Sequence, residues 1–95
     1  MTKEEELMDY LHKNVFNPVL QSSNASKELK AGINLTIMRM KQRKAEGMRQ
    51  YFWSAIIGTE RSIGFSKQLK DAGFTRFEEV LEDFRVKFDD NWLKS

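Results

Sequence analysis

The scarcity of helix-breaking residues most constrains how this chain can fold. Among its 95 residues there is one proline, Pro18, and there are five glycines. Proline and glycine concentrate in turns, and a sandwich or barrel of short strands needs many turns. The sequence therefore predicts an all-α fold, a small bundle of four main helices in a single domain that spans residues 1–95.

From residue 27 to residue 57 the chain has no proline, and only Gly32 and Gly47 weaken a helix. Ser26 precedes this segment as a candidate N-cap. At about 100° per residue, most of its apolar side chains fall on one stripe, which comprises Leu29, Ile33, Ile37, Met40, Met48, Tyr51, Phe52 and Ala55. Because the stripe keeps its phase on both sides of residues 41–47, we predict one long central helix over about 27–57, roughly 45 Å long. A break or kink at Gly47 is the main alternative.

The N-terminal segment predicts a helix over about residues 3–16. Thr2 and Glu5 have the spacing of a capping box, in which a hydroxyl and a carboxylate satisfy backbone N–H groups of the first turn. Apolar side chains then recur at helical spacing. Asn17-Pro18 is predicted to interrupt this helix, because the residue before a proline is disfavoured in the helical conformation.

Two further helices are predicted towards the C-terminus. A shorter helix over about residues 60–72 ends at Gly73, which is suited to a left-handed stop. Thr75 and Glu78 form a second capping-box pattern at the start of an amphipathic C-terminal helix over about 76–93. The buried side of this last helix is predicted to place Phe77, Leu81, Phe84 and Phe88 against Ile33, Ile37, Phe52 and Ala55.

Catalytic and metal-binding patterns are missing from the sequence. His12 is the only histidine and there is no cysteine, so histidine triads, multi-histidine metal sites and thiolate sites do not fit. The runs of acidic residues are typical of solvated helix faces rather than of paired catalytic carboxylates. We therefore expect a protein that is not an enzyme, with no catalytic residues, no metal and no cofactor.

Residues 58–72 superficially match two known motifs. The run from Gly58 to Gly64 has glycines and a hydroxyl, but it lacks the Gly-Lys-Ser/Thr ending and the preceding strand of a phosphate-binding loop. As the reading helix of a helix-turn-helix, residues 59–72 would supply Arg61 and two lysines, but Gly64 interrupts that helix. Neither motif carries a functional prediction.

Charge is distributed unevenly along the chain. Residues 27–49 hold seven Lys and Arg against two Glu, whereas residues 78–90 hold six Asp and Glu against two basic residues. The candidate basic patch for contacts with phosphates comprises Arg39, Lys41, Arg43, Lys44 and Arg49. Its three arginines fall opposite the apolar stripe, where charged side chains are ordinary.

Lys41 and Lys44 differ from the other basic residues. On the same helical wheel they fall near the centre of the apolar stripe, where Leu or Met is expected. Three explanations stay open. The two lysines pair with the acidic C-terminal helix inside the fold, or they project from the bundle and bind the phosphates of a nucleic acid, or they form a polar layer in a dimer seam.

A second candidate surface is apolar. Trp53 and Ile57 lie on the face of the predicted long helix opposite its main stripe, together with Leu35. A helix that is apolar on both faces is either central in its own fold or shared with another chain. Burial within the monomer and contact with a partner both fit this pattern. The candidate protein interface is therefore Leu35, Trp53 and Ile57.

The predicted location is the cytoplasm. The N-terminus is acidic and lacks the apolar run of a signal peptide, and no segment of the sequence is apolar enough to span a membrane. We expect a helical protein-interaction module whose partner is another protein or itself, as a homo-oligomer or a subunit of a larger assembly. The alternative is a nucleic-acid-binding accessory or regulatory protein that uses the basic face of the long helix.

Overall fold

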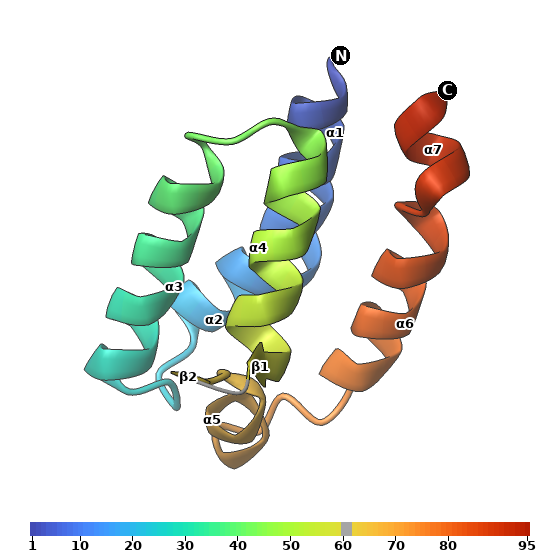
Figure 1. Ribbon diagram of the computed structural model, residues 1–95. Coiled ribbons are helices and arrows are strands. Elements are labelled where there is room, and N and C mark those ends of the chain that lie inside the picture. The colour runs from blue at the N-terminus through green and yellow to red at the C-terminus, as the bar shows by residue number, and fades with distance from the viewer. Residues whose placement is uncertain (60–61) are drawn as a thin grey trace.

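The protein is an all-α bundle, as the sequence predicts. The computed structural model describes residues 1–59 and 62–95. Within these residues the four longest helices are α1 (Lys3–Leu11), α3 (Lys27–Met40), α4 (Ala45–Ile57) and α6 (Phe77–Lys87). Helix α4 lies between α3 and α6, and α1 lies behind it (Figure 1). The two chain ends and the turn between α3 and α4 lie at the same end of the bundle.

The predicted central helix is divided into α3 and α4 by a turn at residues 41–44. The Arg43 N–H donates to the Met40 carbonyl at 3.0 Å, which ends α3 in a tight turn. A straight helix over 27–57 would be roughly 45 Å long, which exceeds the longest dimension of the molecule, 38 Å. The turn instead folds both halves of the apolar stripe onto one core. The alternative break at Gly47 does not occur, because that residue lies inside α4.

The N-terminal helix continues through Pro18, although the sequence predicted an interruption there. After α1 the chain forms a short π-helix, η1 (His12–Phe16), and continues as α2 (Asn17–Gln21). The Asn17 N–H donates to the His12 carbonyl, five residues earlier. This wider turn relieves the clash that a proline ring makes, in an α-helix, with the carbonyl four residues before it.

Helix caps test three local predictions. The capping box of Thr2 and Glu5 is present at the start of α1. Ser26 caps α3 by accepting a hydrogen bond from a backbone N–H of its first turn. The second predicted box, Thr75 with Glu78, does not form, because the chain enters α6 one residue later and through a turn without a side-chain cap.

The predicted helix over 60–72 begins later and is shorter. The two-residue strands β1 (Gly58–Thr59) and β2 (Ser62–Ile63) pair antiparallel, and the helix α5 covers only Ser66–Asp71. A helix of this length does not supply the reading helix considered above. Arg61, which the helix-turn-helix interpretation required, lies outside the described residues.

Two glycines shape this part of the chain. Gly73 has a φ of +93° and ends α5, as predicted. Its N–H donates to the Lys70 carbonyl, and the Phe74 N–H donates to the Leu69 carbonyl, which is the pattern of a Schellman motif. At Gly64 an added Cβ would lie 2.2 Å from a backbone carbonyl oxygen of α4, so this close approach requires glycine.

The predicted C-terminal helix over 76–93 is also divided. Helix α6 ends at Lys87, and Asp89 starts the short helix α7 (Asp90–Lys94) by accepting a hydrogen bond from the Trp92 N–H at 2.9 Å. Aspartate is a strongly preferred N-cap, so Asp89 favours the start of a new helix at this position. The break leaves the carbonyls at the end of α6 without partners inside the helix.

The buried face of α6 is the one predicted from the sequence. Phe77, Leu81, Phe84 and Phe88 are all buried in one continuous hydrophobic cluster. The ring of Phe84 lies 4.8 Å, between centroids, from that of Phe52 on α4. Of the neighbours predicted for this face, Phe52 is in contact with it. Ile33 and Ile37 are also buried, but they belong to α3, on the other side of α4 (Figure 1), and Ala55 is half-buried.

Candidate protein-interaction site

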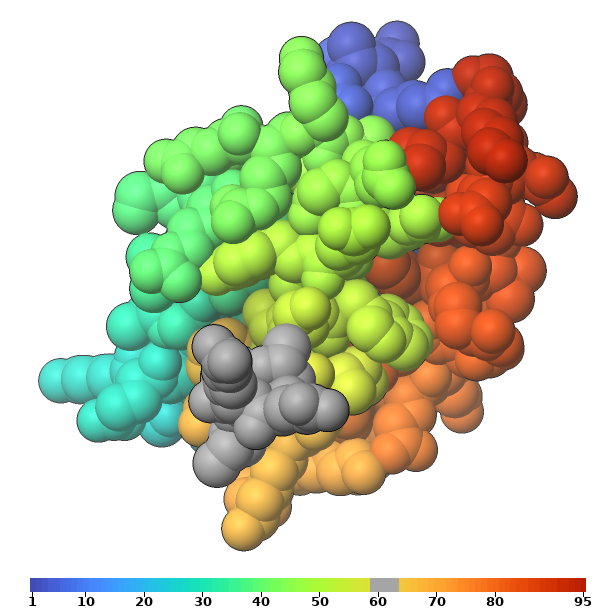
Figure 2. All heavy atoms as spheres, in the orientation of Figure 1, coloured from blue at the N-terminus to red at the C-terminus, as the bar shows by residue number. Residues whose placement is uncertain are grey.

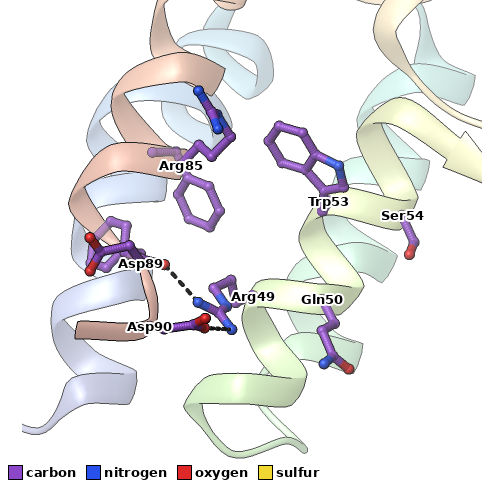
Figure 3. A pocket seen from close by; sticks show the side chains of 9 residues that line it. Arg49, Gln50, Trp53, Ser54, Arg85, Asp89 and Asp90 are labelled. Atoms are coloured by element: carbon purple, nitrogen blue, oxygen red, sulfur yellow. Dashed lines mark hydrogen bonds and ion pairs between the residues drawn. The ribbon is translucent and has the colours of Figure 1, made fainter. Parts of the chain in front are cut away.

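A groove separates the outer edges of α4 and α6, beside the place where the two helices pack in the core. Its volume is about 480 Å³. Phe84 and Phe88, which are almost fully buried, form its floor, and Trp53 and Arg85 extend toward one another from opposite walls (Figure 3). The two walls lie side by side in the space-filling view, α4 in yellow-green and α6 and α7 in orange and red (Figure 2).

Arg49 joins the two walls at one end of the groove. Its guanidinium donates to the Phe88 carbonyl at 3.1 Å and to the Asp90 carboxylate at 3.0 Å (Figure 3). The side chain is only 22% exposed. Arg49 therefore satisfies a carbonyl that the break between α6 and α7 leaves free, and both contacts are strengthened by its charge.

Arg85, on the α6 wall, is paired along its own helix. It donates to the Glu82 carboxylate at 2.6 Å, and both side chains are more than half exposed. The hydrogen bond from Arg85 lowers the pKa of Glu82, and the same hydrogen bond raises the pKa of Arg85. Both groups are therefore fully charged at neutral pH. An exposed pair of this kind adds little to folding stability.

Of the three predicted interface residues, Trp53 lines the groove, and Ile57 lies four residues further along α4 but is not among the residues that line it. Trp53 is 36% exposed, and Ile57, one turn further along, is 49% exposed. Leu35 lies on α3 instead, on the face opposite its buried stripe, where Met38 is also exposed. The prediction that the three share one helix face does not hold, because the turn at residues 41–44 places them on two helices. The exposed apolar residues therefore form two separate patches. We call Trp53 and Ile57 the groove patch, and Leu35 and Met38 the α3 patch.

The predicted basic patch is divided in the same way. Arg39 donates to the Tyr51 hydroxyl at 3.2 Å, and the guanidinium of Arg43 lies 4.3 Å from the centroid of the same ring. Arg49 points to the other side of α4, into the groove. The other four residues of the predicted patch lie together at the end of α3 and in the turn that follows it. We call them the basic turn, which comprises Arg39, Lys41, Arg43 and Lys44.

The turn also removes the anomaly that singled out Lys41 and Lys44. Both are exposed on the turn rather than placed in a helical stripe. Within residues 1–59 and 62–95 neither makes an ion pair, and the acidic side chains Glu78 and Glu82 pair with basic residues of α5 and α6 instead. Pairing with the C-terminal helix is therefore not the reason for these two lysines.

Sequence reasoning missed the charged rim of the groove. Asp89 was a recognisable N-cap inside the predicted last helix, and it marked the break that brings Asp90 to Arg49. No local pattern showed that Arg85 would face Trp53. That juxtaposition depends on how α6 is rotated against α4, and the core aromatic residues determine this rotation.

The described residues offer little chemistry of other kinds. His12 is half-buried with its ring edge against Phe16, at 5.5 Å between centroids. No group of three or more His, Cys, Asp or Glu side chains in residues 1–59 and 62–95 could hold a metal ion. Among these same residues, no helix combines the length and the apolar character that crossing a bilayer requires.

Comparisons with known proteins assign no family. No family model matches the chain, no curated protein has a significantly similar sequence, and no solved structure matches its fold at a significant level.

Proposed function

We propose that this chain is a non-enzymatic helical protein-interaction module, which self-associates or serves as a subunit of a larger assembly, and that it binds through the groove between α4 and α6. The observation that carries the proposal is Trp53. An indole left 36% exposed beside an aromatic floor retains apolar surface that a partner can remove from water. Tryptophan is also among the residues most enriched where protein contacts are strongest.

The surroundings of Trp53 support the same proposal. Ile57 extends the apolar surface by one helical turn. Charged side chains border the groove, with Arg85 on one wall and Asp89 and Asp90 at one end. An apolar centre with a polar rim is the ordinary composition of a protein interface.

Sedimentation velocity over a range of concentrations tests the proposal. We expect the parent protein to associate and a Trp53→Ser/Ile57→Ser variant to sediment as a monomer with an unchanged helical circular dichroism spectrum. Val86→Ser is the matched control, because Val86 is 64% exposed on α6 and does not line the groove. A parent that stays monomeric at high concentration would overturn the proposed self-association and leave a different protein as the partner. A double variant that associates like the parent would overturn the groove as the contact.

Nucleic-acid binding is a second candidate function, favoured by one specific observation. The basic turn presents four cationic side chains, and none of them has a carboxylate partner within 4 Å among the residues that the structure describes. Such a turn could contact successive phosphates as part of an accessory or regulatory protein.

Salt titrations on duplex DNA test this second candidate. If Lys41 and Lys44 contact phosphates, Lys41→Gln/Lys44→Gln weakens binding equally on different sequences and reduces the log–log salt slope by about one per lost contact. Lys13→Gln/Lys67→Gln removes the same charge from other elements and controls for net charge. Equal slopes for the two double variants would exclude the basic turn as the binding site.

A further inference from the structure

The outer side of α3 carries a short row of apolar side chains. Ala31, Leu35 and Met38 follow one another at intervals of four and three residues, the spacing that aligns side chains along one face of a helix. All three are exposed, Leu35 at 42% and Met38 at 56%. The buried side chains of α3 lie on its other side, toward α4, and α3 forms one edge of the bundle (Figure 1). We call the three exposed residues the outer ridge, which is convex and faces solvent.

Basic side chains border the outer ridge and have no carboxylate partners. Residues 27–44 contain six Lys and Arg and one Glu, so their net charge is 6 − 1 = +5. None of these six basic side chains makes an ion pair within the part of the chain that the structure describes. Lys27 lies one helical turn before the outer ridge, and Lys41 and Lys44 follow it in the basic turn. The outer ridge is therefore bounded at both ends by charged lysines.

The arginines and the lysines of the basic turn differ in their contacts. Both arginines are held against α4, because Arg39 donates to the Tyr51 hydroxyl and the guanidinium of Arg43 lies over the same ring. Lys41 and Lys44 are exposed. A lysine on a surface can extend its long side chain until the ammonium group reaches an anion. The lysines are therefore the side chains best placed to contact an anionic surface beside the outer ridge.

We propose that the outer ridge and the basic turn bind the surface of a membrane that contains anionic lipids. Leu35 and Met38 enter the boundary between head groups and acyl chains, and the lysines at both ends of the ridge extend to the anionic head groups. Binding of this kind increases with the apolar area inserted and with the number of cations near the surface. It requires no membrane-spanning helix. It also leaves the groove between α4 and α6 free, because that groove lies on the other side of α4 (Figure 1).

The combination of a convex apolar ridge with flanking cations favours lipid over other anionic partners. The phosphates of a nucleic acid would attract the lysines but would leave Leu35 and Met38 in water. A helical segment of another protein typically lays its apolar face in a groove, whereas the outer ridge is convex. A bilayer surface accepts a convex ridge and presents anionic head groups next to an apolar interior. Two copies of α3 packed face to face would oppose two regions of charge +5.

Cosedimentation with lipid vesicles tests this inference. We expect the parent protein to bind vesicles of phosphatidylcholine mixed with phosphatidylserine, but not vesicles of phosphatidylcholine alone, and to bind more weakly as the salt concentration rises. The turn variant, Lys41→Gln/Lys44→Gln, should bind about 30-fold more weakly, because each lysine near an anionic surface contributes a factor of about five. Lys67→Gln/Lys87→Gln is the matched control. It removes the same charge from exposed positions on α5 and α6 and should weaken binding far less.

A second variant tests the apolar part of the contact. The ridge variant, Leu35→Gln/Met38→Gln, should bind the mixed vesicles at least about tenfold more weakly, because both side chains lose their apolar contact with lipid. Its helical circular dichroism spectrum should be unchanged, since both positions are exposed. Val86→Gln makes a similar change on the exposed side of α6 and should bind like the parent. On duplex DNA the ridge variant should not differ from the parent.

The opposite results would overturn the inference, and some would identify a different occupant. A parent that binds the mixed vesicles no better than phosphatidylcholine alone would exclude an anionic membrane surface. A ridge variant that binds like the parent, or a turn variant that binds like its control, would exclude this face of α3. If the parent binds duplex DNA but not the vesicles, the basic turn is a nucleic-acid site. If it binds no vesicles and the ridge variant loses self-association, a second copy occupies the ridge. The groove has its own test in the Trp53→Ser/Ile57→Ser variant.

Discussion

Helices α4 and α6 meet in two ways, and the two contacts involve neighbouring residues. At Phe52 and Phe84 the side chains are almost fully buried and their ring centroids lie 4.8 Å apart. At Trp53 and Arg85, one residue further along each helix, the same two helices leave an open groove. The first contact is closed and belongs to the core, and the second is open and faces solvent.

Helical geometry explains how one residue separates these two contacts. Successive side chains project about 100° apart, so the residue that follows a buried one emerges at the edge of the helix–helix contact. The position of an apolar residue within the contact therefore decides its role. We expect changes at the closed contact to affect folding, and changes at the open contact to affect association.

Phe84→Ala should produce the largest loss of stability. The ring of Phe84 packs on those of Phe52, Tyr10 and Phe88, with centroids 4.8, 6.3 and 5.1 Å away. Truncating such a buried aromatic side chain costs about 3–5 kcal/mol. Urea denaturation followed by circular dichroism measures the loss, and Val86→Ala on the exposed side of α6 should change stability by less than about 0.5 kcal/mol. A Phe84→Ala protein as stable as the parent would show that the closed contact does not hold the fold together.

Arg49→Met should have an intermediate effect, because it removes the link between the walls of the groove. The variant leaves the Phe88 carbonyl without its donor in a poorly exposed site, which costs about 1–3 kcal/mol. Arg85→Met removes a similar charge from an exposed pair and should cost at most about 1 kcal/mol. Equal losses for the two variants, measured by urea denaturation, would mean that Arg49 is a surface residue in solution.

Ile57→Ala should have a smaller effect on stability and a clear effect on association. Ile57 is 49% exposed, so truncation costs about 1 kcal/mol. Ile56, the preceding residue, has the same side chain but is fully buried, and Ile56→Ala should cost about 2–5 kcal/mol. This matched pair contrasts a core position with an exposed position beside the groove. If Ile57→Ala destabilised the fold as much as Ile56→Ala, the exposed position of Ile57 would be wrong.

Several features set by a few neighbouring residues were predictable from the sequence, although the Thr75–Glu78 capping box was not one of them. Thr2 and Ser26 cap their helices, Gly73 ends α5, and the core side of α6 was identified from the spacing of its aromatic residues. In each case the structure depends on backbone groups within one helical turn or on the periodicity of one helix. Such information is present in a short stretch of sequence.

Features that depend on the size and packing of the bundle were not predictable in the same way. The apolar stripe over 27–57 keeps its phase, yet the chain turns at residues 41–44, where four polar residues in a row were the neglected signal. Conversely, Pro18 predicted a break in the N-terminal helix, but the chain stays helical there because the π-helix η1 makes room for the proline ring. The groove depends on how α4 and α6 pack against each other. The sequence therefore identified Trp53 and Arg49 as candidates but did not show that they share a groove with Arg85, Asp89 and Asp90.

Tyr10, on α1, packs its ring beside those of Phe84 and Phe88, and Tyr10→Phe should have the smallest effect at neutral pH. The Tyr10 hydroxyl donates a long hydrogen bond of 3.5 Å to the Val80 carbonyl, so its loss should cost less than about 1 kcal/mol.

Burial, and to a lesser extent the charge of Asp83, raises the pKa of Tyr10 above its ordinary value of 10.0. The unfolded chain therefore loses this proton at a lower pH than the folded protein does. The stabilisation is complete below pH 10 and disappears as the pH rises through the folded-state pKa. Urea denaturation of both proteins from pH 7 to pH 11 should show a constant difference up to about pH 9, and above pH 10 the parent should lose stability relative to Tyr10→Phe. Parallel curves over the whole range would mean that the phenol is solvated, and that the closed contact ends at Phe84.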